Sequence, residues 1–390
     1  MNISESLNLE AAFAQAEADA QIRRALEQNA QRLAAAQLPN RYNEDWRFGK
    51  PAQFAEELAE MLAAREPVQA AIRIESGDGV NAERISPRDE DLKETLQLMP
   101  TIGSDYFLGL HIERFGTGCC IMLEPGAVVE KPIVITYEVE SGLYTPCTFI
   151  MAGAGAKARI IEKHICRDGA AIFCARSIQL AEGADIAVEL HESGAGVSKA
   201  FNITNIQSLG GHIRHLTMHN GHAWAREETV AEIAEADARG EIRLYSANKL
   251  SGRSVLDQHT KQVHHTGGAF SDLLYKNVVD DQATAIFAGN IYVAPAAHDT
   301  DAYQANRNML LSEKASIHSL PGLEILADRV KCSHGSASSP MDEEQLFYLT
   351  SRGVARRQAQ LLVAEGFLSD VVNHFKQVDG AKELDMSSGN

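Results

Sequence analysis

The sequence lacks the short motifs that mark the common enzyme classes. It contains no phosphate-binding P-loop, no GxSxG nucleophile elbow, no HExxH zinc motif and no glycine-rich dinucleotide turn. Basic residues are also scarce, since 36 Lys and Arg stand against 53 Asp and Glu, giving a formal net charge of -17. Such a surface repels the phosphates of nucleic acids and anionic lipid headgroups. We therefore expect a protein that is not an enzyme and binds neither nucleic acid nor membrane.

Long apolar runs and paired cysteines are missing as well. No run reaches the length of a membrane span, and the N-terminus shows no basic segment followed by an apolar one. The cysteines form no CxxC pair, which fits neither a zinc ribbon nor a disulfide framework. The six are Cys119, Cys120, Cys147, Cys166, Cys174 and Cys332. We expect a protein that stays in the reducing cytoplasm, with enough apolar residues for a sizeable core.

The N-terminal part has a helical pattern. Apolar residues recur at helical spacing in residues 5–36, which predicts one or two amphipathic helices. Pro39 and Asn40 interrupt the pattern, and it resumes in residues 51–65. We therefore expect an N-terminal helical region that ends near residue 66.

The C-terminal part returns to helical patterns. Ser339 and Pro340 suit the cap and the first position of a helix, which we expect to run to Arg352. Two more helices are predicted after Gly353 and on either side of Gly366, at residues 355–365 and 367–378.

Between these ends the chain consists of short, β-branched, alternating stretches and carries a repeat. Six glycines, each opening a strand-like stretch, stand 28 or 29 residues apart: Gly126, Gly155, Gly183, Gly211, Gly240 and Gly268. This period favours a mainly β solenoid, in which stacked turns build one continuous core, over a β-sandwich with coincidental spacing. The predicted regions are 1–66 (N-terminal helical), 67–103 (connecting), 104–338 (β-helix core) and 339–390 (C-terminal helical module).

One short stretch has the chemistry of a metal site. Cys332 and His334 stand two apart in a strand-like segment, so they face the same way and present a thiol beside an imidazole. Both groups suit iron and iron–sulfur species, and Lys331 next to them favours the thiolate. The alternative is a buried cysteine beside a structural histidine, and the motif alone favours that alternative.

The remaining cysteines and histidines are expected to be structural. The other five cysteines lie in apolar contexts typical of a core. A strand would place His212 and His215 on opposite sides, which argues against a shared metal site there. We expect solvated or hydrogen-bonded histidines in this set and in a second one: His212, His215, His219 and His222, then His259, His264 and His265.

Several sequence blocks, taken in order, resemble the SufB/SufD family. They include residues 256–260, the Tyr-Gln-Ala-Asn-Arg-Asn block at residues 302–312, and residues 321–328, 330–335 and 342–353. Within the family, the Cys-Ser-His-Gly form and Trp46-Arg47-Phe48 are similar to the SufD branch. The segment 336–341 and Arg329 depart from the family pattern, which puts the turn into the C-terminal helices in doubt.

The resemblance implies a fold, a function and partners. The fold would be a right-handed parallel β-helix flanked by helical N- and C-terminal regions. The chain would be a non-catalytic scaffold for iron acquisition and iron–sulfur cluster assembly. It would pair with SufB through its late strands and bind the SufC ATPase through its C-terminal helices. The isolated chain would hold no tight cofactor, only transient iron or a nascent cluster shared with SufB.

The resemblance also assigns roles to two residues and leaves alternatives open. His334 matches the family's functional histidine, so we expect it to be an iron or cluster ligand at the SufB interface, with Cys332 as a weaker candidate. The main alternative is a purely structural subunit that stabilises SufB and recruits SufC without binding iron. A β-helix hydrolase or lyase for polysaccharide is a more remote one. An isolated solenoid with exposed late strands also favours a possible homodimer.

Overall fold

The computed structural model describes residues 23–40, 42–46, 48, 51–63, 68–76, 80–85, 90–234 and 240–377. Residues 23–35 are helical, and α2 spans Pro51–Ala63, so both predicted N-terminal helical stretches are confirmed where the chain is described. The part of the first stretch before residue 23, and the chain after residue 377, lie outside the described residues.

The first third of the chain supplies helices and two strands that close one end of the molecule. Its elements are η1 (Glu44–Trp46), α2, β1 (Gln69–Glu75), β2 (Asn81–Ile85), α3 (Glu90–Leu98) and α4 (Asp105–Arg114). Helix α4 falls at the start of the range predicted as β-helix core, and the solenoid strands begin after it, at Gly118.

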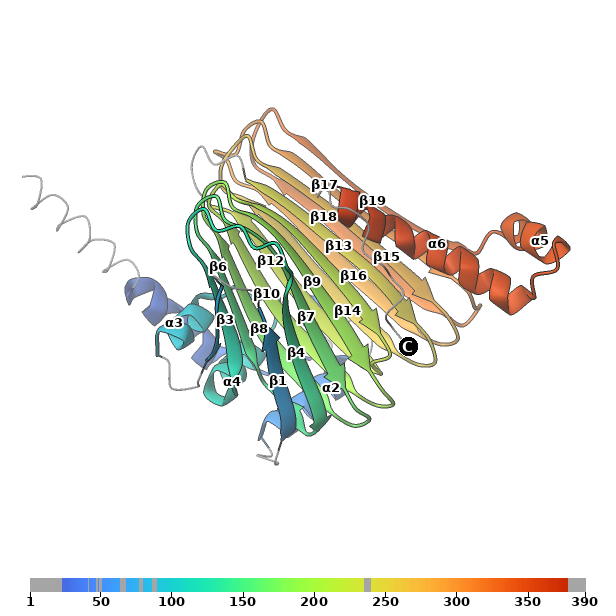
Figure 1. Cartoon of the computed structure of the whole chain (residues 1–390), viewed down its shortest axis with the longest axis horizontal. Helices are drawn as coiled ribbons and strands as arrows, with labels where there is room; N and C mark the ends of the chain where they lie inside the picture. The colour runs from blue at the N-terminus through green and yellow to red at the C-terminus, as the bar shows by residue number, and fades with distance from the viewer. Residues whose placement is uncertain are drawn as a thin grey trace, which may run out of the picture.

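The rest of the chain folds into a parallel β-solenoid (Figure 1). Its strands are β3 (Gly118–Leu123), β4 (Ile133–Ser141), β5 (Leu143–Tyr144), β6 (Cys147–Ala152), β7 (Lys157–Cys166), β8 (Ala171–Leu180), β9 (Asp185–Gly194), β10 (Lys199–Ser208), β11 (His212–Asn220), β12 (Trp224–Ile233), β13 (Glu241–Leu250), β14 (Val255–His264), β15 (Phe270–Val279), β16 (Thr284–Val293), β17 (Asp301–Leu310), β18 (Ser316–Ile325) and β19 (Lys331–Pro340).

Successive strands alternate between two sheets that face each other. Sheet A runs β1-β4-β7-β9-β11-β13-β15-β17-β19, and sheet B runs β18-β16-β14-β12-β10-β8-β6-β3-β2, with β5 beside β8. Each turn of the solenoid therefore adds one strand to each sheet. At the first end, β1 and β2 pair antiparallel with β4 and β3. At the other end, β18 and β19 are the terminal strands.

The repeated glycines sit at the turns before the strands, for two different reasons. Gly183 has φ +67 and Gly155 has φ +68, and a Cβ added to Gly183 would lie 3.9 Å from the Cα of Gly155, so a left-handed turn repeats from one level to the next. Gly211 is needed for close approach, because a Cβ there would lie 2.7 Å from the Cβ of Leu180. The glycine period therefore corresponds to the number of residues in one turn of the solenoid, and the predicted architecture is confirmed.

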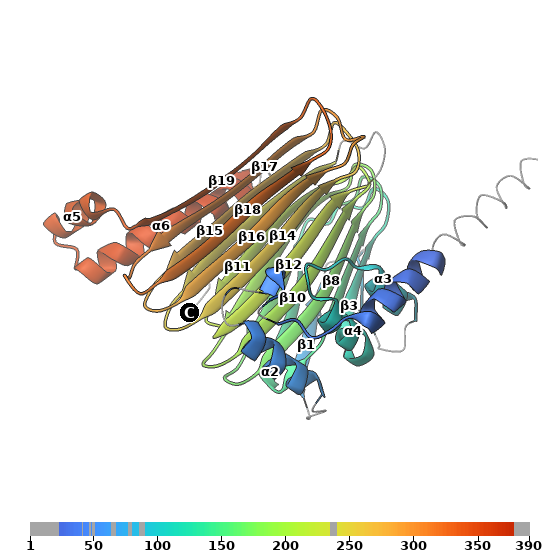
Figure 2. The same ribbon diagram turned by 180° about the vertical axis from the view of Figure 1, so that it is seen from behind.

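Flanking helices cover the outer faces of both sheets. The N-terminal helices pack on sheet B around buried Trp46, Phe107 and Phe201 (Figure 2). On sheet A, Val371 and Phe375 of α6 pack against Leu216 and Tyr245. Burial of these aromatic and aliphatic side chains provides the main favourable free energy for docking the helices.

The C-terminal helices differ in two details from the sequence prediction. Strand β19 continues to Pro340, and α5 (Glu343–Ser351) is capped by Asp342, whose carboxylate accepts from the backbone N–H of Glu344, so a start at Pro340 was wrong. One helix, α6 (Arg356–Gln377), replaces the two predicted segments. It continues through Gly366, because an exposed glycine costs a helix only about 1 kcal/mol, which packing on sheet A offsets.

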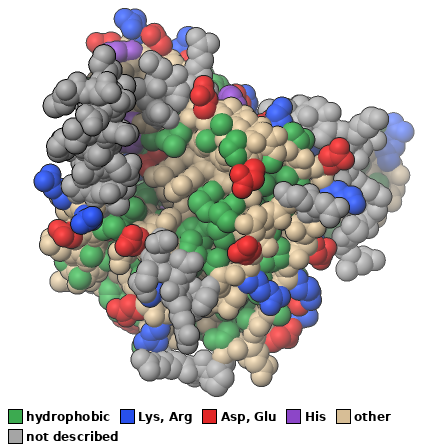
Figure 3. Space-filling view, turned by 60° about the vertical axis from the view of Figure 1, so that its left-hand side comes forward, with side chains coloured by type: hydrophobic (Ala, Val, Ile, Leu, Met, Phe, Trp, Pro, Cys, Tyr) green, Lys and Arg blue, Asp and Glu red, His purple; other side chains and the backbone are tan. Residues whose placement is uncertain are grey.

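The surface shows mixed charge and some exposed apolar residues. On the face seen in Figure 3, acidic and basic side chains surround a central area of hydrophobic and neutral side chains. In the described part of the chain, no helix is both long and apolar enough to cross a membrane.

Candidate metal-binding end of the solenoid

The inner faces of the two sheets carry polar side chains as well as apolar ones. Because side chains alternate along a strand, every second residue points into the solenoid. In β11 these are Ile213, His215, Thr217 and His219, all buried. Similar polar positions recur in neighbouring strands, so a row of polar groups follows the solenoid axis between apolar flanks.

A closed group of charged and sulfur-containing side chains occupies the early part of this row. Glu162, His164 and Cys174 offer three possible ligand atoms within 4.8 Å of one another, and all three residues are buried. Arg176 contacts both carboxylate oxygens of Glu162, one of them through Nε at 3.1 Å. His164 lies between two carboxylates, with Nε2 2.7 Å from Glu162 and Nδ1 2.6 Å from Glu192.

The pKa shifts in this group follow from burial and pairing. Burial alone would raise the pKa of Glu162, but Arg176 and His164 outweigh it and hold the pKa well below the usual range. Burial would lower the pKa of His164, whereas the charge of Glu192 and hydrogen bonds raise it well above its usual value. Burial and the charge of Glu162 raise the pKa of the Cys174 thiol, so the thiol is protonated.

The closed group is therefore satisfied without a metal ion. Two carboxylates face one guanidinium and one imidazolium, so their charges cancel, and each charged group has a hydrogen-bonding partner. We interpret it as a structural network. Sequence reasoning missed it, although aligning the strands on the glycine period would have placed Glu162, His164 and Arg176 on inner positions.

The predicted histidine sets are placed as hydrogen-bonded or solvated side chains, except His215. Both ring nitrogens of His215 are buried and have no hydrogen-bonding partner among the described residues, so the prediction was wrong for this residue. His212 is exposed and His215 is buried, which confirms that they face opposite sides. His219 Nε2 lies 3.0 Å from Glu227 Oε2, and His222 Nε2 lies 3.2 Å from Glu192 Oε2. In the second set, His259 contacts Asp257, His264 contacts Ser271, and His265 is exposed.

The two predicted ligands lie together at the open end of the solenoid. Cys332 and His334 belong to β19, the last strand of sheet A, and pair in register with Ala302 and Gln304 of β17. Ala302 and Gln304 are buried residues that point into the solenoid. Cys332 and His334 therefore point to the same inner side and extend the row of inner residues by one turn. A hydrogen bond further along β19 supports this orientation, because Ser338 Oγ accepts from Nδ2 of the inner residue Asn308 at 3.2 Å.

The environments of these two side chains differ. Cys332 is half-buried against Ile291, Val293 and Ala302, whereas His334 is exposed. Burial raises the pKa of the Cys332 thiol, and Asp301 adds to this effect. The prediction that Lys331 favours the thiolate was wrong, because Lys331 Nζ lies 3.6 Å from the Asp301 carboxylate on the outer side. The thiol of the isolated chain is therefore mostly protonated near neutral pH.

The open end presents only part of a ligand set. Neither Cys332 nor His334 belongs to a group of three possible metal ligands within the described residues. Iron and zinc sites with sulfur and nitrogen ligands normally need four.

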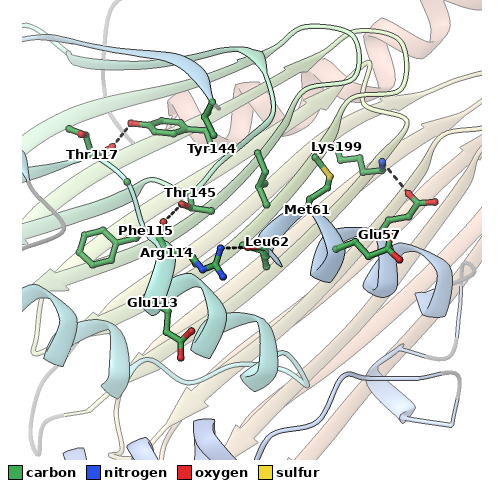
Figure 4. Close-up of a pocket in the computed structure, with 14 residues that line it drawn as sticks. Glu57, Met61, Leu62, Glu113, Arg114, Phe115, Thr117, Tyr144, Thr145 and Lys199 are labelled. Carbon is green, nitrogen blue, oxygen red and sulfur yellow. Dashed lines mark hydrogen bonds and ion pairs between the residues drawn. The ribbon is translucent and has the colours of Figure 1, made fainter. Parts of the chain in front are cut away.

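The large surface cavity lies elsewhere, near the first turns, and has a volume of about 950 Å³ (Figure 4). Its polar groups hold the helices in place: Arg114 Nη1 donates to the Leu62 carbonyl at 2.6 Å, and Thr145 Oγ1 donates to the Arg114 carbonyl at 2.7 Å. Lys199 pairs with Glu57 at 3.1 Å. These contacts fasten α2 and α4 to the solenoid, and we assign no chemistry to this cavity.

The fold and the open end define a class: a two-sheet parallel β-solenoid that presents a Cys-x-His pair on its last strand. The family model described as "SUF system FeS cluster assembly, SufBD core domain" matches residues 135–367, more than half of the chain. The chain therefore belongs to the SufB/SufD family of the SUF iron–sulfur cluster assembly system, and it is of the SufD type.

Individual relatives agree with this assignment. The iron–sulfur cluster assembly protein SufD of Escherichia coli is 26% identical over 402 residues, covering 92% of this chain and 90% of the relative. SufD of Bacillus subtilis is 36% identical over 128 residues, 33% of this chain and 29% of the relative. A SufBD family protein of Synechocystis is 42% identical over 125 residues, covering 32% and 27% respectively. The Escherichia coli match extends the resemblance over nearly the whole chain.

Proposed function

We propose that this protein is a non-catalytic scaffold subunit of a cytoplasmic SufB–SufC–SufD complex, in which it supports iron acquisition and cluster assembly at the interface with SufB. Iron or the nascent cluster is cargo in this proposal, not a resident cofactor. The observation that carries it is the open end of the solenoid, where His334 and Cys332 stand over the inner row with an incomplete ligand set.

The geometry of the last turn supports pairing with SufB. Within the described residues, strands β18 and β19 each have one unpaired edge, which is a template for strands of another chain. Leu323, Ile325 and Leu326, at the end of β18, are exposed hydrophobic residues. A related solenoid joined there would cover these residues and place its own side chains opposite His334. Ligands from both subunits would then complete the site, with His334 as the stronger candidate and Cys332 as the weaker one.

The C-terminal helices support a second contact, with the SufC ATPase. Phe347 and Tyr348 of α5 are 74% and 60% exposed, and Leu362 of α6 is 48% exposed. Large apolar side chains exposed together on a small helical module are typical of a docking surface. ATP hydrolysis by SufC bound here would open the SufB interface and release the cluster.

The test is reconstitution with SufB and SufC of the same organism, followed by anaerobic iron and sulfide analysis of the purified complex. We expect His334→Ala to form the complex and lose most of its iron, and Cys332→Ser to lose less. His318→Ala is the matched control, because His318 lies on β18 but packs outward against Phe48, with ring centroids 5.0 Å apart. It should keep the iron content of the wild type.

The outcomes separate the two functions that the family suggests. Unchanged iron in His334→Ala and in Cys332→Ser would reject the ligand role and leave a structural subunit that stabilises SufB and recruits SufC. Recovery of the chain only as a homodimer would show that the open edges select a second copy rather than SufB.

A further inference from the structure

Gln304 lies directly behind His334 on the inner face of sheet A. The two residues are paired in register on neighbouring parallel strands, so their side chains stack one turn apart. Gln304 is only 2% exposed, whereas His334 is exposed. Gln304 is therefore a fixed inner residue adjacent to the side chain that we propose as an iron ligand.

The amide of Gln304 has an unused acceptor. Its Nε2 donates a long hydrogen bond to the Gly289 carbonyl at 3.5 Å, but its Oε1 is buried and has no partner among the described residues. The amide extends over Gly289, where an added Cβ would lie 2.5 Å from Oε1. The residue paired with Gly289 in the next turn is Pro321, which has no N–H to donate.

The side-chain amide of Asn306, the next inner residue of β17, has no free acceptor to offer. Asn306 Oδ1 already accepts from Asn308 Nδ2 at 2.7 Å and from Ser319 Oγ at 3.0 Å. Leaving a buried acceptor such as Gln304 Oε1 without a partner costs about 1–3 kcal/mol. His334, one turn further out on the same face, is paired in register with Gln304, and its ring can donate a hydrogen bond.

We propose that Gln304 is a positioning residue for His334: when the exposed His334 ring turns inward, the unpartnered Gln304 Oε1 accepts a hydrogen bond from one ring nitrogen, which fixes the tautomer and directs the other nitrogen toward the iron at the open end. The inference rests on the proposed function, in which His334 binds iron. Hydrogen bonds of this kind commonly orient metal-binding histidines, and removing one typically lowers metal affinity about 10- to 100-fold.

The test compares variants that differ at the acceptor. Gln304→Leu keeps a similar volume but removes the acceptor, whereas Gln304→Glu keeps an acceptor. Gln304→Asn keeps the amide, but its side chain is shorter by one methylene, so the acceptor lies farther from His334. Gln262→Leu is the control, because Gln262 is also a buried inner glutamine but its Nε2 donates to Ser271 at 2.7 Å. Iron affinity is measured on the complex with SufB and SufC. Nitrogen-15 NMR of the histidine-labelled chain reports the tautomer of His334, with its signal assigned by its loss in His334→Ala.

We expect iron affinity to fall about 10-fold or more in Gln304→Leu and Gln304→Asn, and to stay near wild type in Gln304→Glu and Gln262→Leu. The His334 signals should show one neutral tautomer in the wild type and a mixture in Gln304→Leu. Unchanged affinity and tautomer in both Gln304→Leu and Gln304→Asn would overturn the inference. Where Gln304→Leu fails to form the complex, Gln304→Asn decides.

Failure of the proposed function gives a different result. If His334→Ala keeps its iron, the ligand role of His334 is rejected, while the tautomer measurement still decides whether Gln304 holds the ring. If His334→Ala loses iron and Gln304→Leu does not, the proposed function stands and the positioning role of Gln304 is rejected.

Discussion

Two pairs of cysteine and histidine lie on the inner surface of the solenoid, and they differ in every property that decides metal binding. His164 and Cys174 are buried and share Glu162 as a partner. His334 is exposed and Cys332 half-buried, on a terminal strand. The first pair has its charges cancelled inside one chain, whereas the second lacks a full set of neighbours.

The difference shows that ligand-type residues do not by themselves make a cargo site. A metal ion entering the first group would have to displace Arg176 from Glu162 and break both contacts of His164. At the open end an ion meets side chains whose coordinating atoms are accessible and whose remaining ligands can come from a partner. We therefore expect the closed group to control the stability of the solenoid and the open pair to control cargo binding.

The largest expected effect comes from breaking the closed group. Arg176→Met removes the cation that contacts both oxygens of Glu162 and leaves a buried carboxylate with less compensation. We expect the free energy of unfolding to fall by about 3–5 kcal/mol, measured by urea unfolding followed by circular dichroism.

The matched control is Arg329→Met, because Arg329 also pairs with a carboxylate, that of Asp299 at 3.3 Å, but is 70% exposed. Water and salt screen an exposed pair, so this variant should be nearly as stable as the wild type. Equal losses in the two variants would contradict the structural role of the closed group.

Acid should destabilise the fold through the closed group. Burial opposes ionisation of Glu192, but His164 and His222 hold its pKa well below the usual range. Its stabilising contribution is thus present above about pH 4.3, the ordinary glutamate pKa, and is lost as the pH falls through the lower folded-state pKa.

Glu192→Gln should therefore be less stable than the wild type by about 2–3 kcal/mol at pH 7, and the two should converge as the pH falls through the lowered pKa of Glu192. Urea unfolding at a series of pH values measures this. His334→Ala serves as the comparison and should run parallel to the wild type throughout. A constant gap between Glu192→Gln and the wild type would show that Glu192 does not titrate as proposed.

Much of the architecture was predictable because it repeats. The spacing of Gly155, Gly183 and Gly211 repeats once per solenoid turn, since each turn needs a sharp corner and a close approach at the same place. The ends were less predictable because they do not repeat. The helix through Gly366 depends on packing against sheet A, which no local pattern contains.

The candidate site was predictable only where it was local. Cys332 and His334 are two residues apart, so strand alternation alone places them together, and the family resemblance gives His334 a role. The neighbours that act on them come from the preceding turn. Asp301, 31 residues before Cys332, affects the Cys332 thiol, and Gln304, 30 residues before His334, lies behind His334. The prediction for Lys331 was wrong because its partner, Asp301, lies on the neighbouring strand β17, and the local sequence does not show this contact.

The reactivity of the thiols should distinguish Cys332 of the open pair from Cys174 of the closed group in a single experiment. Of the six free cysteines, five are buried and Cys332 is half-buried. Alkylation of the native chain, read by mass spectrometry, should modify Cys332 alone, and unfolding in urea should expose all six. Because burial raises the pKa of the Cys332 thiol, its reaction should accelerate as the pH rises above neutral. Early modification of Cys174 would show that the closed group opens.

The smallest expected effect is on the stability of the open end itself. Cys332→Ser should change the free energy of unfolding by less than about 0.5 kcal/mol, because the site is partly solvated. Cys174→Ser should cost about 1–2 kcal/mol, because the Cys174 thiol donates to Glu162 at 3.6 Å inside a buried network. Urea unfolding at two protein concentrations compares the variants. A larger cost for Cys332→Ser that grows with concentration would mean that a second copy of the chain already covers β19, and the open end would then be an interface even without SufB.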